Sequence, residues 1–210
     1  MLPAPDFLFD GPARGKCIVI LAHGAGAPMD TPFMAAIAAG LAAEGLRVAR
    51  FEFPYMAERR RSGRRKPPDR EPVLIDTWRA AIAALGKPGK LVIGGKSMGG
   101  RMASLVADES DVAGLLCLGY PFHPPGKPDK LRTAHLEKLR TPALIVQGTR
   151  DPFGTKDDVA AYALSKKIHL YWSEDGDHDL KPRKASGRTH AEALAAAVAA
   201  AAQFISTLKG

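Results

Sequence analysis

The chain has 210 residues, of which 46% are hydrophobic, and this length fits one well-buried core but is short for two. We therefore expect a single domain over residues 1–210. The formal net charge of +8 raises nucleic acid as a partner, but half of the excess lies in residues 58–71, where no aromatic residue interleaves the arginines. Because no nucleic-acid-binding motif accompanies this segment, the sequence argues against such a partner.

Cys17 and Cys117 fall in apolar runs, which is typical of buried free thiols in a reducing compartment. They lack the spacing of a metal site, and the sequence indicates no cofactor. The first residues have no positive head or long apolar stretch of a secretory signal, so we expect a cytoplasmic protein. Residues 191–208 are long enough to cross a bilayer, but Glu192 and Gln203 interrupt them, so we expect a helix packed on the sheet and no membrane association.

Short apolar runs bounded by turn residues predict six strands with helices between them. In chain order, the predicted strands are 17–22, 47–53, 91–94, 112–119, 143–147 and 168–172. The predicted helices are 32–44, 73–85, 98–107, 156–165 and 190–208, with a weaker pattern at 131–139. Continuously apolar strands that alternate with helices are typical of a parallel sheet covered on both faces. We therefore predict a three-layer α/β fold around a mainly parallel, six-stranded sheet.

In such a sheet the loops after the strands meet at one edge, where ligands bind. The loop after the third predicted strand carries the pattern G-x-S-x-G at residues 95–99, with Ser97 at its centre. A strand before and a helix after this pattern are typical of a nucleophile elbow, which exposes a serine hydroxyl, although short matches also arise by chance. A phosphate-binding P-loop is excluded because its first glycine would fall at Lys90. We predict that Ser97 is a nucleophile.

A serine nucleophile needs a histidine to accept its proton and a carboxylate to orient that histidine. Asp151 follows the fifth predicted strand and His178 follows the sixth, so both are predicted at the same edge as Ser97. The other candidates have plainer explanations as sheet, helix-surface, loop or capping residues: His135, His169, His190, Asp157, Asp158, Asp175, Asp177 and Asp179.

Attack on a carbonyl places negative charge on oxygen, which preset N–H donors stabilise. We expect one donor to be the amide of Met98, directly after the nucleophile. The second is expected from the loop at residues 23–27, where Ala25 is favoured and Gly24 and Gly26 are alternatives. The same glycine-rich loop is also compatible with a simple tight turn. His23 is expected to shape this loop.

Together these segments resemble the α/β-hydrolase superfamily, close to dienelactone hydrolases, in which the nucleophile, the acid and the histidine follow in this order. More narrowly, the chain is similar to the hydrolase-like family that contains a testis-expressed protein and the third subunit of the non-specific-lethal chromatin complex. The narrower resemblance rests on residues 23–26, 53–56 with the arginine-rich stretch to 69, 94–101, 119–128, 148–154 and 176–180.

The resemblance spans nearly the whole chain and implies a hydrolase fold with Ser97, Asp151 and His178 in catalytic positions. It leaves the substrate undefined. The chromatin-associated members imply that some relatives act as interaction modules, so a protein partner stays open.

A chain of this length leaves little room for a lid over the site, so we expect an open cleft. Residues 54–72 form the longest insertion and begin at the predicted catalytic edge. Arg60, Arg61 and Arg64 from this insertion, with Lys127, are expected at the substrate rim, which gives the hypothesis that the substrate bears a negative group. A solvated, partly disordered loop is the alternative.

Two classes of function remain. The first is a serine hydrolase that cleaves a carboxylic ester or thioester of a small molecule through an acyl-enzyme intermediate. The second is a catalytically idle hydrolase fold that binds a protein or a small ligand. Three matched residues in the required order favour the first class.

Overall fold

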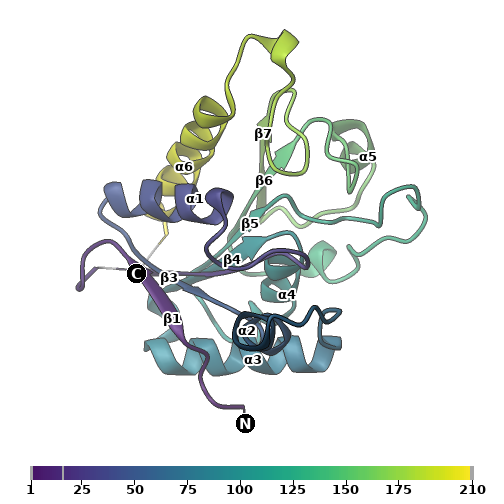
Figure 1. Ribbon diagram of the computed structural model, residues 1–210. Coiled ribbons are helices and arrows are strands. Elements are labelled where there is room, and N and C mark those ends of the chain that lie inside the picture. The colour runs from purple at the N-terminus through teal and green to yellow at the C-terminus, as the bar shows by residue number, and fades with distance from the viewer. Residues whose placement is uncertain (1, 16, 209–210) are drawn as a thin grey trace.

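The computed structural model describes residues 2–15 and 17–208, and a central sheet separates two layers of helices within these ranges (Figure 1). Across the sheet, the strands are β1 (Phe7–Asp10), β3 (Arg47–Phe51), β2 (Ile18–Ala22), β4 (Leu91–Lys96), β5 (Gly114–Leu118), β6 (Ala143–Gly148) and β7 (Ile168–Ser173). All neighbouring strands are parallel except β1 and β3. The predicted three-layer α/β fold is confirmed, with one strand more than the sequence indicated.

The additional strand is β1, which runs antiparallel to β3 at the sheet edge, with Phe7 opposite Phe51. It has only four residues, and Leu8 and Phe9 are exposed. The sequence prediction missed β1 because its apolar run, Phe7–Phe9, has only three residues, a weaker signal than that of the longer buried strands.

Helices α1 (Pro32–Ala43) and α6 (His190–Ser206) pack together on one face of the sheet, while α2 (Pro54–Ser62), α3 (Glu71–Leu85) and α4 (Met98–Val106) lie on the other (Figure 1). Helix α5 (Lys156–Ala160) follows β6. No helix in the described ranges is long and apolar enough to cross a membrane. The predicted domain spans residues 1–210, and both of its limits lie outside the described residues.

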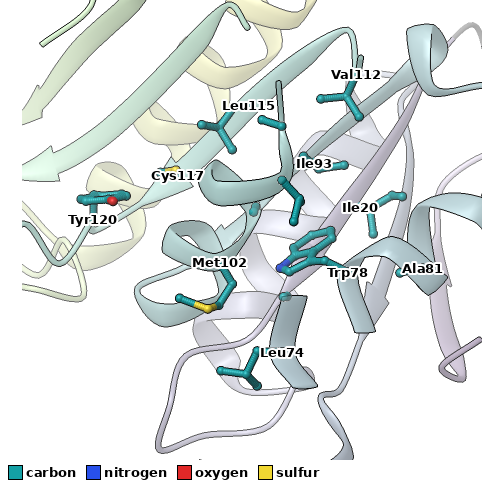
Figure 2. Packing of buried hydrophobic residues seen from close by; sticks show 14 of the residues in the cluster. Ile20, Leu74, Trp78, Ala81, Ile93, Met102, Val112, Leu115, Cys117 and Tyr120 are labelled. Carbon is teal, nitrogen blue, oxygen red and sulfur yellow. The ribbon is translucent and has the colours of Figure 1, made fainter. Parts of the chain in front are cut away.

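The core under α3 and α4 is built around Trp78, which is fully buried. Figure 2 shows its indole among Ile20 and Ile93 from the sheet and Met102 from α4. The indole Nε1 also donates a hydrogen bond to the carbonyl oxygen of Gly99, over 3.3 Å. This packing fixes the first turn of α4, which directly follows Ser97.

Three predictions of local structure, one loop and two helices, need correction. Residues 54–72 were expected as a loop, but α2 forms there, with Pro54 in its first turn and Gly63 in the left-handed conformation (φ 70°) at its end. The predicted helix 156–165 stops at Ala160, and Ser165 does not continue it but bonds the Leu136 and Leu139 carbonyls. The weak pattern at 131–139 forms only a short 3-10 turn, Leu136–Lys138.

Candidate active site

Ser97 occupies a strained turn between β4 and α4. Its φ and ψ are 50° and −115°, a conformation that is rare for a residue with a side chain. The turn is held by the Ser97 amide, which donates to the Leu118 carbonyl over 2.9 Å. Gly99 is needed beside it, because a Cβ there would lie 2.5 Å from the Ala22 carbonyl oxygen. The backbone therefore takes the sharp strand-to-helix turn that the G-x-S-x-G pattern predicts.

Asp151 and His178 meet at the ends of β6 and β7. The imidazole Nδ1 donates to Asp151 Oδ2 over 2.8 Å, which leaves Nε2 as the proton acceptor of the ring. The Asp151 carboxylate is fully buried and also accepts hydrogen bonds from Gln147 Nε2 and from the Phe153 amide, each over 2.9 Å. These donors offset part of the cost of burying a carboxylate and fix its orientation.

Close backbone contacts hold the segment that carries His178. A Cβ on Gly119 would lie 2.8 Å from the His178 carbonyl oxygen, and one on Gly148 would lie 2.3 Å from that of Gly176. The Phe153 ring packs on the imidazole, with 4.3 Å between the ring centroids. The histidine is therefore restrained from both its backbone and its ring.

Ser97 and His178 line the same pocket, which has a volume of about 460 Å³. Its other walls are residues 24–28, residues 31–34, Lys96, Phe153, Asp179 and His190. Within the ranges that the structure describes, no hydrogen bond joins the Ser97 hydroxyl to His178, and such catalytic contacts often tighten only around substrate. The structure thus joins Asp151 to His178 directly and brings Ser97 to the same pocket.

The residues predicted as oxyanion donors also lie beside Ser97. Met98 is the first residue of α4, so its N–H has no acceptor within the helix. Ala25 lines the pocket, and a Cβ on the preceding Gly24 would lie 3.7 Å from Ser97 Cβ. Both amides therefore belong to backbone that borders the serine.

His23 is fully buried and shapes the loop, in keeping with the prediction for it. Its Nδ1 donates to the Gly24 carbonyl over 2.6 Å, and its Nε2 accepts from the Phe53 amide over 3.1 Å. Burial lowers the pKa of this imidazole. A neutral ring with both nitrogens engaged is a structural element, not a second base.

The four predicted rim residues lie elsewhere. Arg60 forms ion pairs with Glu52 and Asp30, and it lines a separate pocket of about 440 Å³ together with Arg61. Arg64 and Lys127 are exposed. None of the four lines the pocket that contains Ser97. The structure does not bring the positive charges of this set to the serine.

A serine–histidine hydrogen bond outside this pocket joins Ser104 of α4 to His135, with 2.8 Å between Oγ and Nε2. His135, which the sequence placed on a solvated face, is instead half-buried. The Ser104 hydroxyl is almost fully buried and donates to the Arg101 carbonyl over 2.6 Å. Because Ser104 faces none of the pockets described and its hydroxyl is held within its own helix, this pair stabilises the fold.

Lys96, just before the nucleophile, is a functional candidate that the sequence analysis did not single out. Its side chain is largely buried, and Nζ donates to the His178 carbonyl over 2.7 Å and pairs with Asp179 over 3.2 Å. The ammonium also lies 5.5 Å from the centre of the Phe33 ring. Burial lowers the pKa of Lys96, and the Asp179 carboxylate opposes that shift. A lysine at the first x position of G-x-S-x-G was the only signal in the sequence for the contact between Lys96 and the His178 segment.

Replacing Lys96 with methionine is expected to lower the free energy of unfolding by about 1–3 kcal/mol, because the His178 carbonyl loses its donor while the aliphatic packing is kept. Urea denaturation measures this change. The exposed Lys166 provides the matched substitution, Lys166→Met, which should leave stability within about 0.5 kcal/mol of the wild type. Equal stability of the two variants would show that the buried ammonium does not hold this segment.

Within the described ranges, no group of three or more histidine, cysteine, aspartate or glutamate side chains is arranged to hold a metal ion. Both cysteines are free thiols, Cys117 buried and Cys17 partly so.

Similar architecture occurs in solved hydrolase structures. A serine hydrolase homologue from Coxiella burnetii superposes with a TM-score of 0.71 at 19% identity, over 92% of this chain and 90% of that one. A dienelactone hydrolase from Anabaena variabilis gives 0.70 at 21% identity, over 96% and 91%. Est1E from Butyrivibrio proteoclasticus gives 0.69 at 16% identity, over 95% and 93%. These similarities establish the fold.

The family model described as an alpha/beta hydrolase domain matches residues 15–206, which is most of the chain. The matched range includes the turn at Ser97 after β4 and the segments after β6 and β7. The chain therefore belongs to the alpha/beta hydrolase domain family.

Proposed function

We propose that the protein is a serine hydrolase that cleaves a carboxylic ester or thioester of a small molecule through an acyl-enzyme intermediate. The observation that carries the proposal is the hydrogen bond from His178 Nδ1 to the buried Asp151 carboxylate, at a pocket that also contains the strained Ser97. Such a pair holds the imidazole in the tautomer that accepts a proton at Nε2.

In the proposed reaction, Ser97 Oγ attacks the carbonyl carbon while His178 Nε2 takes the hydroxyl proton. The carbonyl oxygen becomes an oxyanion that the Met98 and Ala25 amides stabilise. When the tetrahedral intermediate collapses, His178 returns the proton to the leaving alcohol or thiol. Water then attacks the acyl-enzyme by the same route, releasing the acid and restoring Ser97.

The pocket walls favour a small substrate with an apolar group, because Pro28, Pro32, Phe33, Met34 and Phe153 line it. We propose no preference for anionic substrates, since the guanidinium of Arg60 is already paired with two carboxylates. The narrower family resemblance and the cytoplasmic location stay predictions from the sequence.

Labelling with a fluorophosphonate, followed by intact-mass spectrometry, tests the proposal. The wild type is expected to gain one adduct, and Ser97→Ala none, because the probe requires a serine activated by a neighbouring base. Ser104→Ala is the matched control, since Ser104 also contacts a histidine, and it should label like the wild type. A wild type without an adduct would favour the alternative, a catalytically idle binding module, whereas an adduct on Ser97→Ala would place the nucleophile elsewhere.

A further inference from the structure

Helix α2, which carries the three consecutive arginines 59–61, is bonded to the loop that borders Ser97. The Tyr55 hydroxyl donates to the Ala25 carbonyl over 2.8 Å, and Arg59 Nη1 donates to the Gly26 carbonyl over 3.3 Å. His23 donates to the Gly24 carbonyl from within the loop. Three successive carbonyls, those of residues 24–26, are therefore engaged by side chains.

Engaging these carbonyls also sets the direction of the amides. A trans peptide unit is planar, and its C=O and N–H point in opposite directions. When the Gly24 carbonyl is bound by His23, the N–H of Ala25 is directed away from that ring. In the same way, the Tyr55 bond to Ala25 directs the Gly26 N–H away from α2. Within the described residues, neither the Ala25 nor the Gly26 amide donates to another protein atom, so both stay available to an oxyanion.

Helix α2 is itself held in place by hydrogen bonds and ion pairs to the segments before and after it. The Asp69 carboxylate accepts a hydrogen bond from the Tyr55 amide over 2.9 Å. Arg60 pairs with Glu52, which precedes the helix, over 2.7 Å and with Asp30, which follows the loop, over 3.0 Å. These bonds make α2 a fixed support for the loop, and they give the paired arginine a role that does not involve substrate.

We propose that Tyr55 is a positioning residue. Its hydroxyl bonds the Ala25 carbonyl and lies 3.5 Å from the Gly24 carbonyl oxygen, so it holds the two peptides whose N–H groups, those of Gly26 and Ala25, face the oxyanion formed at Ser97. The inference rests on the proposed hydrolase function. In this proposal α2, which follows β3, supports the loop whose amides stabilise the transition state.

The Tyr55 side chain suits this task. It is almost fully buried, and its ring packs edge-on against that of His23, with 5.7 Å between centroids. Burial raises the pKa of the Tyr55 hydroxyl, and the nearby Asp69 carboxylate raises it further. The hydroxyl therefore keeps its proton, and its donor function, throughout the pH range of an esterase assay.

Tyr55→Phe removes only the hydroxyl. With p-nitrophenyl butyrate as substrate, we expect kcat to fall at least ten-fold while KM changes by less than two-fold, because an oxyanion donor acts in the transition state and not on the bound ester. The inhibition constant of a trifluoromethyl ketone, whose adduct with Ser97 carries an oxyanion, should rise by the same factor. The inhibition constant of butyrate, which forms no such adduct, should not change.

Tyr162→Phe is the matched control, because Tyr162 packs on Phe122 away from the pocket. It should leave all four constants unchanged. If Tyr55→Phe does not fold, Arg59→Ala replaces it, and it should lower kcat at least three-fold with the same selectivity for the ketone.

Unchanged kcat in the folded variants would overturn the positioning role, and so would equal shifts of KM and of both inhibition constants, since a general loss of structure affects them all. If the wild type neither labels nor hydrolyses esters, the proposed function fails and this inference fails with it. If the wild type is active and Tyr55→Phe is equally active, only the inference is wrong.

Discussion

Replacing His178 with glutamine is expected to lower kcat/KM for p-nitrophenyl esters by about 10⁴-fold or more, because Ser97 then has no base to accept its proton. Asp151→Asn should have an effect of similar order, since an amide in place of the buried carboxylate favours the wrong imidazole tautomer at the 2.8 Å contact with Nδ1. Initial rates over a range of substrate concentrations measure both effects. The double variant should be little worse than His178→Gln alone, because the two residues act as one unit.

His190→Gln is the control for this experiment. His190 lines the same pocket, but its Nε2 bonds the Asp179 carbonyl over 2.9 Å and it lies at the start of α6. Its replacement should change kcat/KM by less than about three-fold, a barrier change of about 0.6 kcal/mol or less. If His178→Gln were no worse than His190→Gln, another group would have to be the base.

Replacing Gly94 with alanine is expected to lower the free energy of unfolding by more than about 4 kcal/mol, or to prevent folding. A Cβ at this position would lie 1.8 Å from the Leu116 carbonyl oxygen, so β4 and β5 would have to separate where they pair. Gly95→Ala should be comparably damaging, because its φ of 148° is strained for other residues and its Cβ would lie 2.1 Å from the Ala22 carbonyl oxygen. Urea denaturation and soluble yield measure both effects.

Gly89→Ala is the control, since Gly89 has a normal φ and no heavy atom lies within 4 Å of the position its Cβ would take. This variant should unfold within about 0.5 kcal/mol of the wild type. A stable Gly94→Ala protein would mean that β4 and β5 adjust more freely than the backbone contact indicates.

The sequence predicted the positions of Ser97, Asp151 and His178 relative to the fold because each follows a parallel strand, and the ends of such strands meet at one edge. The strands before Ser97 and Asp151, β4 and β6, are buried and largely apolar, whereas β7, before His178, is a half-buried edge strand that still has an apolar and aromatic sequence. The sharp turn at Ser97 could also be anticipated, since Gly95 and Gly99 flank it and a glycine avoids the side-chain clashes that such a turn creates.

Contacts between residues far apart in the chain could not be predicted in the same way. Gln147 supports Asp151 from the end of β6, and only a polar residue ending an apolar strand hinted at it. Tyr55 reaches Ala25 across thirty positions of the sequence. The charge of Arg60 suggested a substrate anion because the sequence does not reveal that Glu52 and Asp30 already neutralise it.

The strand β4, which leads to Ser97, lies between β2 and β5, and this order separates two parts of the proposed site. The proposed base His178 and its partner Asp151 follow β7 and β6, whereas the proposed loop donor Ala25 and its support Tyr55 follow β2 and β3. Met98, the other proposed donor, follows β4 itself. Substitutions at Pro28, Pro32, Phe33 or Met34, which line the pocket after β2, would therefore change the acyl group accepted while leaving the proposed acid–base pair intact. Relatives that keep the histidine and aspartate but differ in this stretch would share a reaction and diverge in what they accept.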